Sequence, residues 1–196
     1  MTQILSDAEY IISDVSVTNT TPNFYTESIN YIGNALSRGL HRLEVELTVN
    51  LTNEQDIRRF NAFMLNNKGR LNPFKLSLLD DTDGKGNCNP FYYDAAPMLA
   101  NDIKIGNDRM ILSGISNAIP AGTMFQFPND TKVYTFLDDV SNNKTVRFFP
   151  ATRLQQPIKA RLKLSVEPLL RLTSDDYQMK FSNGHQEIKI KASEVL

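Results

Sequence analysis

The stretch Arg42-Leu43-Glu44-Val45-Glu46-Leu47-Thr48-Val49-Asn50-Leu51 alternates polar and apolar side chains at every position. Side chains of a β-strand point in turn to the two faces of a sheet, so this alternation predicts a strand with one buried and one solvated face. The same pattern returns at 159–167 and at 187–191. Three such strands, far apart in the sequence, indicate a mainly β protein built on a mostly antiparallel sheet.

One amphipathic helix is predicted directly after the first of these strands, over residues 53–67. Thr52 and Gln55 have the spacing of a capping box, and Lys68-Gly69 suits a helix C-terminus. A further strand is predicted at 71–79. The apolar side chains of the helix fall on one stripe that can pack against a sheet: Ile57, Phe60, Phe63 and Met64.

The middle of the chain has a different pattern of residues. Residues 95–157 contain short strand-like pieces that are separated by turns rich in Gly, Pro and Asn, which is typical of a small closed β-barrel. We therefore expect an inserted barrel at 95–157 within a discontinuous outer domain made of 1–94 and 158–196. The predicted barrel strands are 103–105, 110–112, 123–127, 133–136 and 145–149.

The composition excludes several functional classes. The chain has 196 residues, with 21 Lys and Arg against 22 Asp and Glu, two His and one Cys. Cys88 has no second thiol with which to form a disulfide or a zinc site, and His41 and His185 show no metal-ligand spacing. The net charge of −1 argues against a strongly cationic nucleic-acid binder. We expect neither cofactor nor metal.

Catalytic and membrane signatures are also missing from the sequence. There is no GxSxG nucleophile elbow and no glycine-rich phosphate loop, and we expect no enzyme activity. The first ten residues lack a positively charged n-region and an apolar h-region, so we expect no Sec export. No apolar run approaches the roughly 20 residues that a spanning helix needs, and we expect no integral membrane segment.

Two groups of side chains are candidates for binding or assembly. Alternating charges on two predicted strands would form cross-strand ion pairs if the strands are neighbours, or set the register between subunits if they lie at a subunit boundary: Arg42, Glu44, Glu46, Lys159, Arg161 and Lys163. Basic and aromatic residues of the inserted barrel could bind carbohydrate or single-stranded nucleic acid, although aromatic residues two apart are also what a barrel core requires: Lys132, Tyr134 and Arg147.

The ordered layout resembles a known family. The segments that support the resemblance are Gly69-Arg70-Leu71-Asn72-Pro73-Phe74, Ile119-Pro120-Ala121-Gly122, Lys132-Val133-Tyr134 and the closing strand from Glu187 to Leu196. Across residues 30–196 the chain resembles the distal tail proteins of bacteriophages with long, flexible, non-contractile tails. The resemblance implies a tail-tube-like β-sandwich or barrel with one flanking α-helix, and an inserted small OB-like (oligonucleotide/oligosaccharide-binding) β-barrel.

The resemblance also implies a structural role in the virion. Such proteins form a homohexameric ring at the tail tip, or baseplate, between the tail tube protein and the hub or fibre proteins, with a central channel for DNA. The protein would then be made in the host cytoplasm and reside at the distal end of the tail, with no catalytic residues, and a cell-surface carbohydrate is a further candidate partner. The alternatives are a barrel-based carbohydrate or single-stranded nucleic-acid binding module, and another tail-tube or tail-completion protein. Residues 1–30 match nothing specific and form either an arm that reaches a neighbour or a local edge strand.

Overall fold

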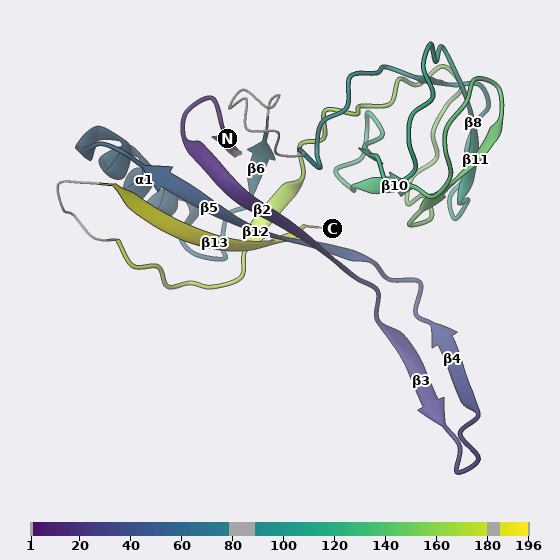
Figure 1. Ribbon diagram of the computed structural model, residues 1–196, viewed down its shortest axis with the longest axis horizontal. Coiled ribbons are helices and arrows are strands. Elements are labelled where there is room, and N and C mark those ends of the chain that lie inside the picture. Colours follow the sequence, from purple (N-terminus) through teal and green to yellow (C-terminus); the bar gives the residue numbers. More distant parts are fainter. Residues whose placement is uncertain (1, 79–88, 180–184, 196) are drawn as a thin grey trace.

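The computed structural model describes residues 2–78, 89–179 and 185–195, and Figure 1 shows two β units and a projecting hairpin. The first unit is a six-stranded sheet with strand order β1-β6-β12-β13-β5-β2. Neighbouring strands are antiparallel except for β1 and β6, which run parallel. The strands are β1 (Gln3–Ser6), β2 (Ile11–Thr20), β5 (Arg42–Leu51), β6 (Phe74–Ser77), β12 (Leu169–Leu172) and β13 (Gln186–Glu194).

The alternating stretch 42–51 forms β5, inside this sheet, with β2 on one side and β13 on the other. The prediction of one buried face is confirmed, because all five apolar side chains of β5 lie in the core: Leu43, Val45, Leu47, Val49 and Leu51. Strand β13 contains the predicted 187–191 strand and pairs with β5 from Gln186↔Leu51 to Ser193↔Glu44. The central sheet pairing therefore joins residues more than 130 positions apart.

The predicted helix is α1 (Glu54–Asn67), and its apolar stripe is buried as expected. The N-cap is Asn53 and not Thr52, because the Asn53 side chain accepts the backbone N–H of Asp56 at 2.9 Å. The helix ends at Lys68 in the left-handed region, and Gly69 follows with φ of 61°. A Cβ at Gly69 would lie 2.8 Å from Cα of Asp175, so both the dihedral and the space require glycine.

The second unit is an antiparallel five-stranded sheet of order β7-β8-β11-β10-β9 that curls around its own core. Its centre is aromatic: the ring centroids of Phe125 and Phe136 are 4.4 Å apart, and Tyr134 stacks on Phe125 at 5.6 Å. The mainly β fold with one helix is thus confirmed. The strands are β7 (Met98–Leu99), β8 (Arg109–Ser113), β9 (Met124–Phe125), β10 (Tyr134–Phe136) and β11 (Thr145–Phe149).

Two sequence-based expectations about this second unit were wrong. The segment 103–105 is no strand, and Ile103 makes only an isolated bridge with Gln156. The segment 159–167 is not a strand of the outer sheet either, since Leu162 and Leu164 belong to the core of the second unit. Val166 already belongs to the first core, so the second unit extends beyond 157 to about 164. The alternation was real, but period-two patterning does not indicate which of two cores a face covers.

Candidate functional site

A hairpin arm is the most exposed feature of the molecule. Strands β3 (Asn23–Glu27) and β4 (Gly33–Ser37) pair with each other and with no strand of the two described sheets. Figure 1 shows the arm joining the end of β2 to the start of β5 and pointing away from β6. Its tip is closed by backbone hydrogen bonds from Ser28 N–H to the Ile32 carbonyl (3.0 Å) and from Tyr31 N–H to the Ser28 carbonyl (2.9 Å).

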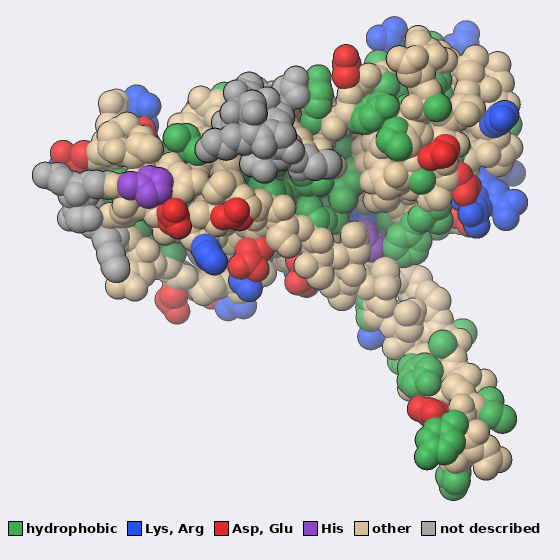
Figure 2. Space-filling view, viewed as in Figure 1, with side chains coloured by type: hydrophobic (Ala, Val, Ile, Leu, Met, Phe, Trp, Pro, Cys, Tyr) green, Lys and Arg blue, Asp and Glu red, His purple; other side chains and the backbone are tan. Residues whose placement is uncertain are grey.

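The arm is rich in apolar side chains and poor in charge. Ile29 is 98% exposed and Tyr31 88% exposed, and every residue from 23 to 40 is exposed. Glu27 and Arg38 are the only charged residues between 21 and 40, and the Arg38 guanidinium lies 5.1 Å from the ring centre of Phe24. Figure 2 shows apolar side chains gathered along the arm and at its tip. The large exposed apolar residues of the arm and its base are Phe24, Tyr25, Ile29, Tyr31, Ile32, Leu36 and Leu40.

Such an arm has the properties of an interaction surface. An isolated two-stranded hairpin is marginally stable in water, because it has no core to bury. A contiguous apolar surface on a projecting element marks a contact site for another molecule. The chemistry it offers is apolar and neutral, so it fits a partner surface of the same kind.

The base of the arm, in contrast, is held firmly. His41 follows the arm directly and is buried, with Nε2 2.9 Å from Oδ1 of Asn19 on β2. Its ring packs edge-on against Phe149 of the second unit, with centroids 5.1 Å apart. Burial lowers the pKa of His41 to about 4, and the nearby charge of Lys132 acts in the same direction. The imidazole is therefore neutral at pH 7.

A buried ion pair lies beside this histidine and joins the two units. Lys132, 1% exposed, forms a salt bridge with Glu194 of β13, which is 2% exposed, and its Nζ also donates to the His41 carbonyl at 3.2 Å. Glu194 further accepts the backbone N–H groups of Val133 (2.7 Å) and Leu43 (3.3 Å). Burial lowers the pKa of Lys132, and the Glu194 carboxylate opposes that shift. The pair fixes the second unit to the strand end at the base of the arm.

A second polar cluster holds the neighbouring loop of the second unit. Asp130 forms a salt bridge with Arg153 and accepts the Tyr134 hydroxyl at 2.7 Å and the Lys132 N–H at 3.0 Å. Burial alone would raise the pKa of Asp130, but the bonds from Arg153 and Tyr134 outweigh it and lower the pKa. Burial and the bond to Asp130 raise the pKa of Tyr134. Both Asp130 and Tyr134 are buried, so this cluster stabilises the loop and presents no reactive group to solvent.

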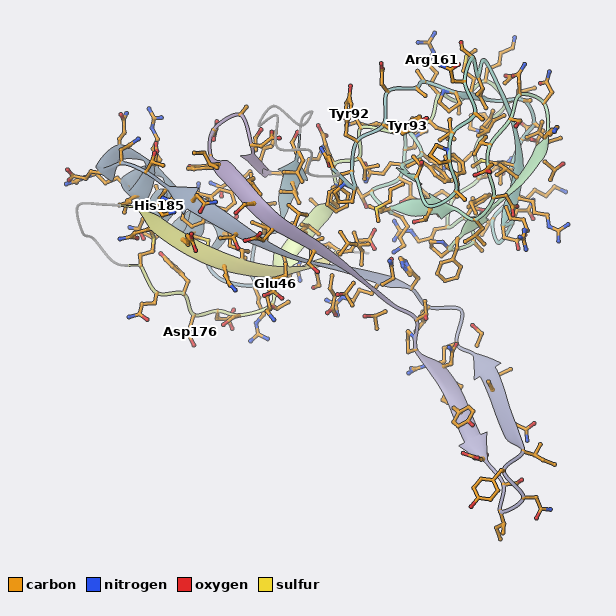
Figure 3. The ribbon with its side chains drawn as sticks, in the orientation of Figure 1. Glu46, Tyr92, Tyr93, Arg161, Asp176 and His185 are labelled. Carbon is orange, nitrogen blue, oxygen red and sulfur yellow. The ribbon has the colours of Figure 1, made fainter. Side chains whose placement is uncertain are left out.

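The predicted charged residues do not meet in the predicted way. Figure 3 shows Glu46 on the sheet and Arg161 on the second unit, far from each other. The actual partner of Glu46 is Lys191 of β13, at 2.9 Å. The cross-strand alternative was wrong because 159–163 belongs to the other core, whereas the subunit-boundary alternative stays a prediction. The remaining members lie as follows: Arg42 donates to Ser193 Oγ at 2.5 Å, Glu44 is opposite Ser193, Lys163 pairs with Glu167 at 2.8 Å, and Lys159 sits in a turn with φ of 65°.

The predicted barrel binding surface was also wrong for two of its three residues. Lys132 and Tyr134 are buried, one in the ion pair and the other in the aromatic core, so neither can bind a ligand at the surface. The core-packing alternative is the correct one for the aromatic residues. Arg147 is exposed, and its guanidinium is held by Asp138 at 2.7 and 2.9 Å. That contact lowers the pKa of Asp138 to about 2.

Residues 1–30, for which the sequence offers two roles, fall into two parts in the structure. Residues 3–6 and 11–20 are the two end strands of the first sheet, which is the edge-strand alternative. Residues 23–27 are half of the arm. A usable signal was present: apolar residues at 24, 25, 29, 31 and 32 stand among Asn, Ser, Thr and Gly without the strict alternation of a half-buried strand.

Neither metal-ligand clusters nor spanning helices in the described part of the chain, nor known families, point to a further site. Among the described residues, no three His, Cys, Asp or Glu side chains gather as metal ligands, and Cys88 lies outside those residues. No helix in the described part of the chain is long and apolar enough to cross a membrane. Comparison with protein-family models and with curated proteins found no match for this chain.

Proposed function

We propose that the protein is a structural subunit of a phage tail, a distal tail protein that assembles into a ring at the tail tip. The observation that supports this best is the neutral, apolar arm, whose exposed side chains need a surface to cover them. The mainly β fold, the single helix and the interruption by a second β unit agree with the layout on which the resemblance rests. Six copies per ring is the number that the resemblance implies.

Assembly through the arm would explain why the base of the arm is held by several buried contacts. A hinge that moved freely would carry the arm over many directions, and ordering it would oppose association. The Lys132–Glu194 pair and the His41–Asn19 contact fix the arm base to both units before any partner binds. In this proposal the first unit forms the ring, and the tail tube protein and the hub or fibre proteins bind its two faces. DNA passes through the channel without being held.

The test is the mass and shape of the assembled species. Light scattering after size exclusion is expected to give a concentration-dependent oligomer, and negative-stain images are expected to show rings with a central hole. Immunogold labelling of virions is expected at the tail tip alone, whereas a tube protein would be labelled along the whole tail. A protein that stays monomeric at high concentration and is missing from virions would refute the proposal.

Most of the residues proposed for the binding-module alternative are not available at the surface. Two of its three candidate side chains, Lys132 and Tyr134, are buried. A fluorescent oligonucleotide titration and a glycan array test the alternative directly. Saturable binding that is lost in Arg147→Ala would revive it.

A further inference from the structure

A polar pocket lies at the β1 edge of the first sheet, whereas the arm leaves from the opposite, β2 edge. It has a volume of about 370 Å3, and its lining comes from the start of β1, the end of α1 and the turn before β6: Thr2, Gln3, Asn66, Asn67, Asn72 and Pro73. Pockets of about 300–1,000 Å3 are large enough to receive a small ligand or a few side chains. All six lining residues are uncharged.

Three buried polar atoms of this pocket have no hydrogen-bond partner among the described residues. They are Oδ1 and Nδ2 of Asn67 and Oε1 of Gln3. Asn67 is 0% exposed. An unpaired buried polar group costs about 1–3 kcal/mol, so two such side chains at one pocket indicate that something else supplies their partners. A group that offers both a donor and an acceptor, such as a carboxamide or a water molecule, would satisfy these atoms.

Apolar side chains are exposed next to the pocket residues in the chain. Leu65 precedes Asn66 on α1, and Leu71 precedes Asn72 in the turn, and both are exposed. The expected ligand therefore combines an uncharged carboxamide with apolar groups. The tip of the arm has this chemistry, since Asn30 is flanked by Ile29, Tyr31 and Ile32 and the tip carries no charge.

We propose that this pocket receives the arm tip of a second copy of the chain, with the Asn30 carboxamide paired to Asn67 and Gln3. The inference rests on the proposed function and names the surface on which the arm docks. The arm points away from β6, and therefore away from the pocket of its own chain (Figure 1). The arm leaves from β2 and the pocket adjoins β1, the two end strands of one sheet. Contacts between different surfaces of identical subunits run head to tail, and they close into a ring when the rotation allows.

The experiment uses two variants that disable opposite halves of the contact. Ile29→Ser/Tyr31→Ser removes the tip and keeps the pocket, while Asn66→Trp fills the pocket mouth from an exposed position and keeps the tip. Each variant alone is expected to be monomeric where the wild type is oligomeric. An equimolar mixture is expected to form a 1:1 dimer that grows no further, because only one intact tip and one intact pocket remain. Mass photometry measures all three samples.

Matched controls separate docking from general surface effects. Ile105→Ser/Leu137→Ser removes two exposed apolar groups from the second unit, and Gln55→Trp adds an indole at the other end of α1. Both controls are expected to assemble as the wild type does. Asn67→Leu is expected to weaken assembly at least about tenfold, and to leave the unfolding free energy of the tip-variant monomer unchanged or higher.

The possible failures are distinguishable. If Asn66→Trp and Asn67→Leu assemble as the wild type does, the arm docks elsewhere, so this inference is overturned and the proposed function stands. If the tip variant assembles normally, the arm has no part in association and this inference is again overturned. A wild-type protein that is monomeric throughout overturns both the inference and the proposed function.

Discussion

Lys132 shows how a single buried charge connects two parts of this molecule. Its ammonium group has one carboxylate partner, Glu194, and one carbonyl partner, His41. Lys132→Met would leave the Glu194 carboxylate buried without its counter-charge, and breaking such a pair costs about 3–5 kcal/mol. Urea unfolding at pH 7 measures this loss. The matched control is Lys163→Met, which removes an exposed pair with Glu167 and should cost no more than about 1 kcal/mol. Equal losses in the two variants would show that Lys132 has no special structural role.

His41 makes the stability of the protein depend on pH. Its folded-state pKa is about 4, whereas an unfolded chain has a value near 6.5. Between these values the unfolded chain binds a proton that the folded chain does not, so stability falls as the pH is lowered through this window. We expect a loss of about 2 kcal/mol from pH 7 to pH 5, measured by urea unfolding. His41→Gln should flatten this dependence, and an unchanged slope in that variant would contradict the assignment. Asp138 and Asp175, with pKa values of about 2, lose their contribution at lower pH.

The burial of Lys132 could not be predicted from the sequence. Tyr134 and Phe136 are two apart and both are buried, as the core-packing alternative expected, but Lys132 precedes β10 and turns toward Glu194 of the first unit. The charge of Lys132 suggested a surface position, because an isolated ammonium group is too costly to bury. Its partner Glu194 is 62 positions away and has no local sequence signal. Long-range pairing of this kind depends on the tertiary fold, which local patterns do not specify.

At the scale of the element, the arm is expected to be dynamic in the monomer and ordered in the assembly. Its strands have no covering layer, so its amide hydrogen bonds should open with little cost. Hydrogen exchange measured by mass spectrometry at low concentration should show residues 23–37 exchanging within seconds. At concentrations where rings form, the same peptides should become protected, while peptides from β5 stay protected throughout. An arm already protected in the monomer would show that it is stable without a partner.

The elements that were predicted well share one property, which is a strong periodic pattern next to a single core. Strand β5 and helix α1 each bury one regular face, and their positions were expected to within one or two residues. The segment 159–167 has the same kind of pattern but crosses from one core to the other between Leu164 and Val166. The arm was not predicted as a hairpin, because it buries neither face and so has no such period.

At the scale of the whole molecule, the second unit is inserted at a point where the chain enters and leaves side by side. The Tyr93 N–H donates to the Leu164 carbonyl at 3.2 Å, and the Val166 N–H donates to the Phe91 carbonyl at 2.7 Å. Replacing residues 95–164 by a short Gly-Ser linker should therefore keep the six-stranded sheet, since its strands and α1 all lie outside the deletion. Insertions joined by adjacent strands are commonly separable in this way.

Removing the second unit would test which part of the molecule assembles. The arm and the polar pocket both belong to the first unit, so the shortened protein is expected to unfold cooperatively and to form oligomers of the same copy number. The deletion exposes Glu194 to water in place of Lys132, which removes the need for a counter-charge. Circular dichroism and light scattering measure folding and copy number. A folded but monomeric product would show that assembly needs the second unit, either for a surface of its own or because Lys132 and Phe149 hold the base of the arm. An unfolded product would show that the first core depends on the insertion.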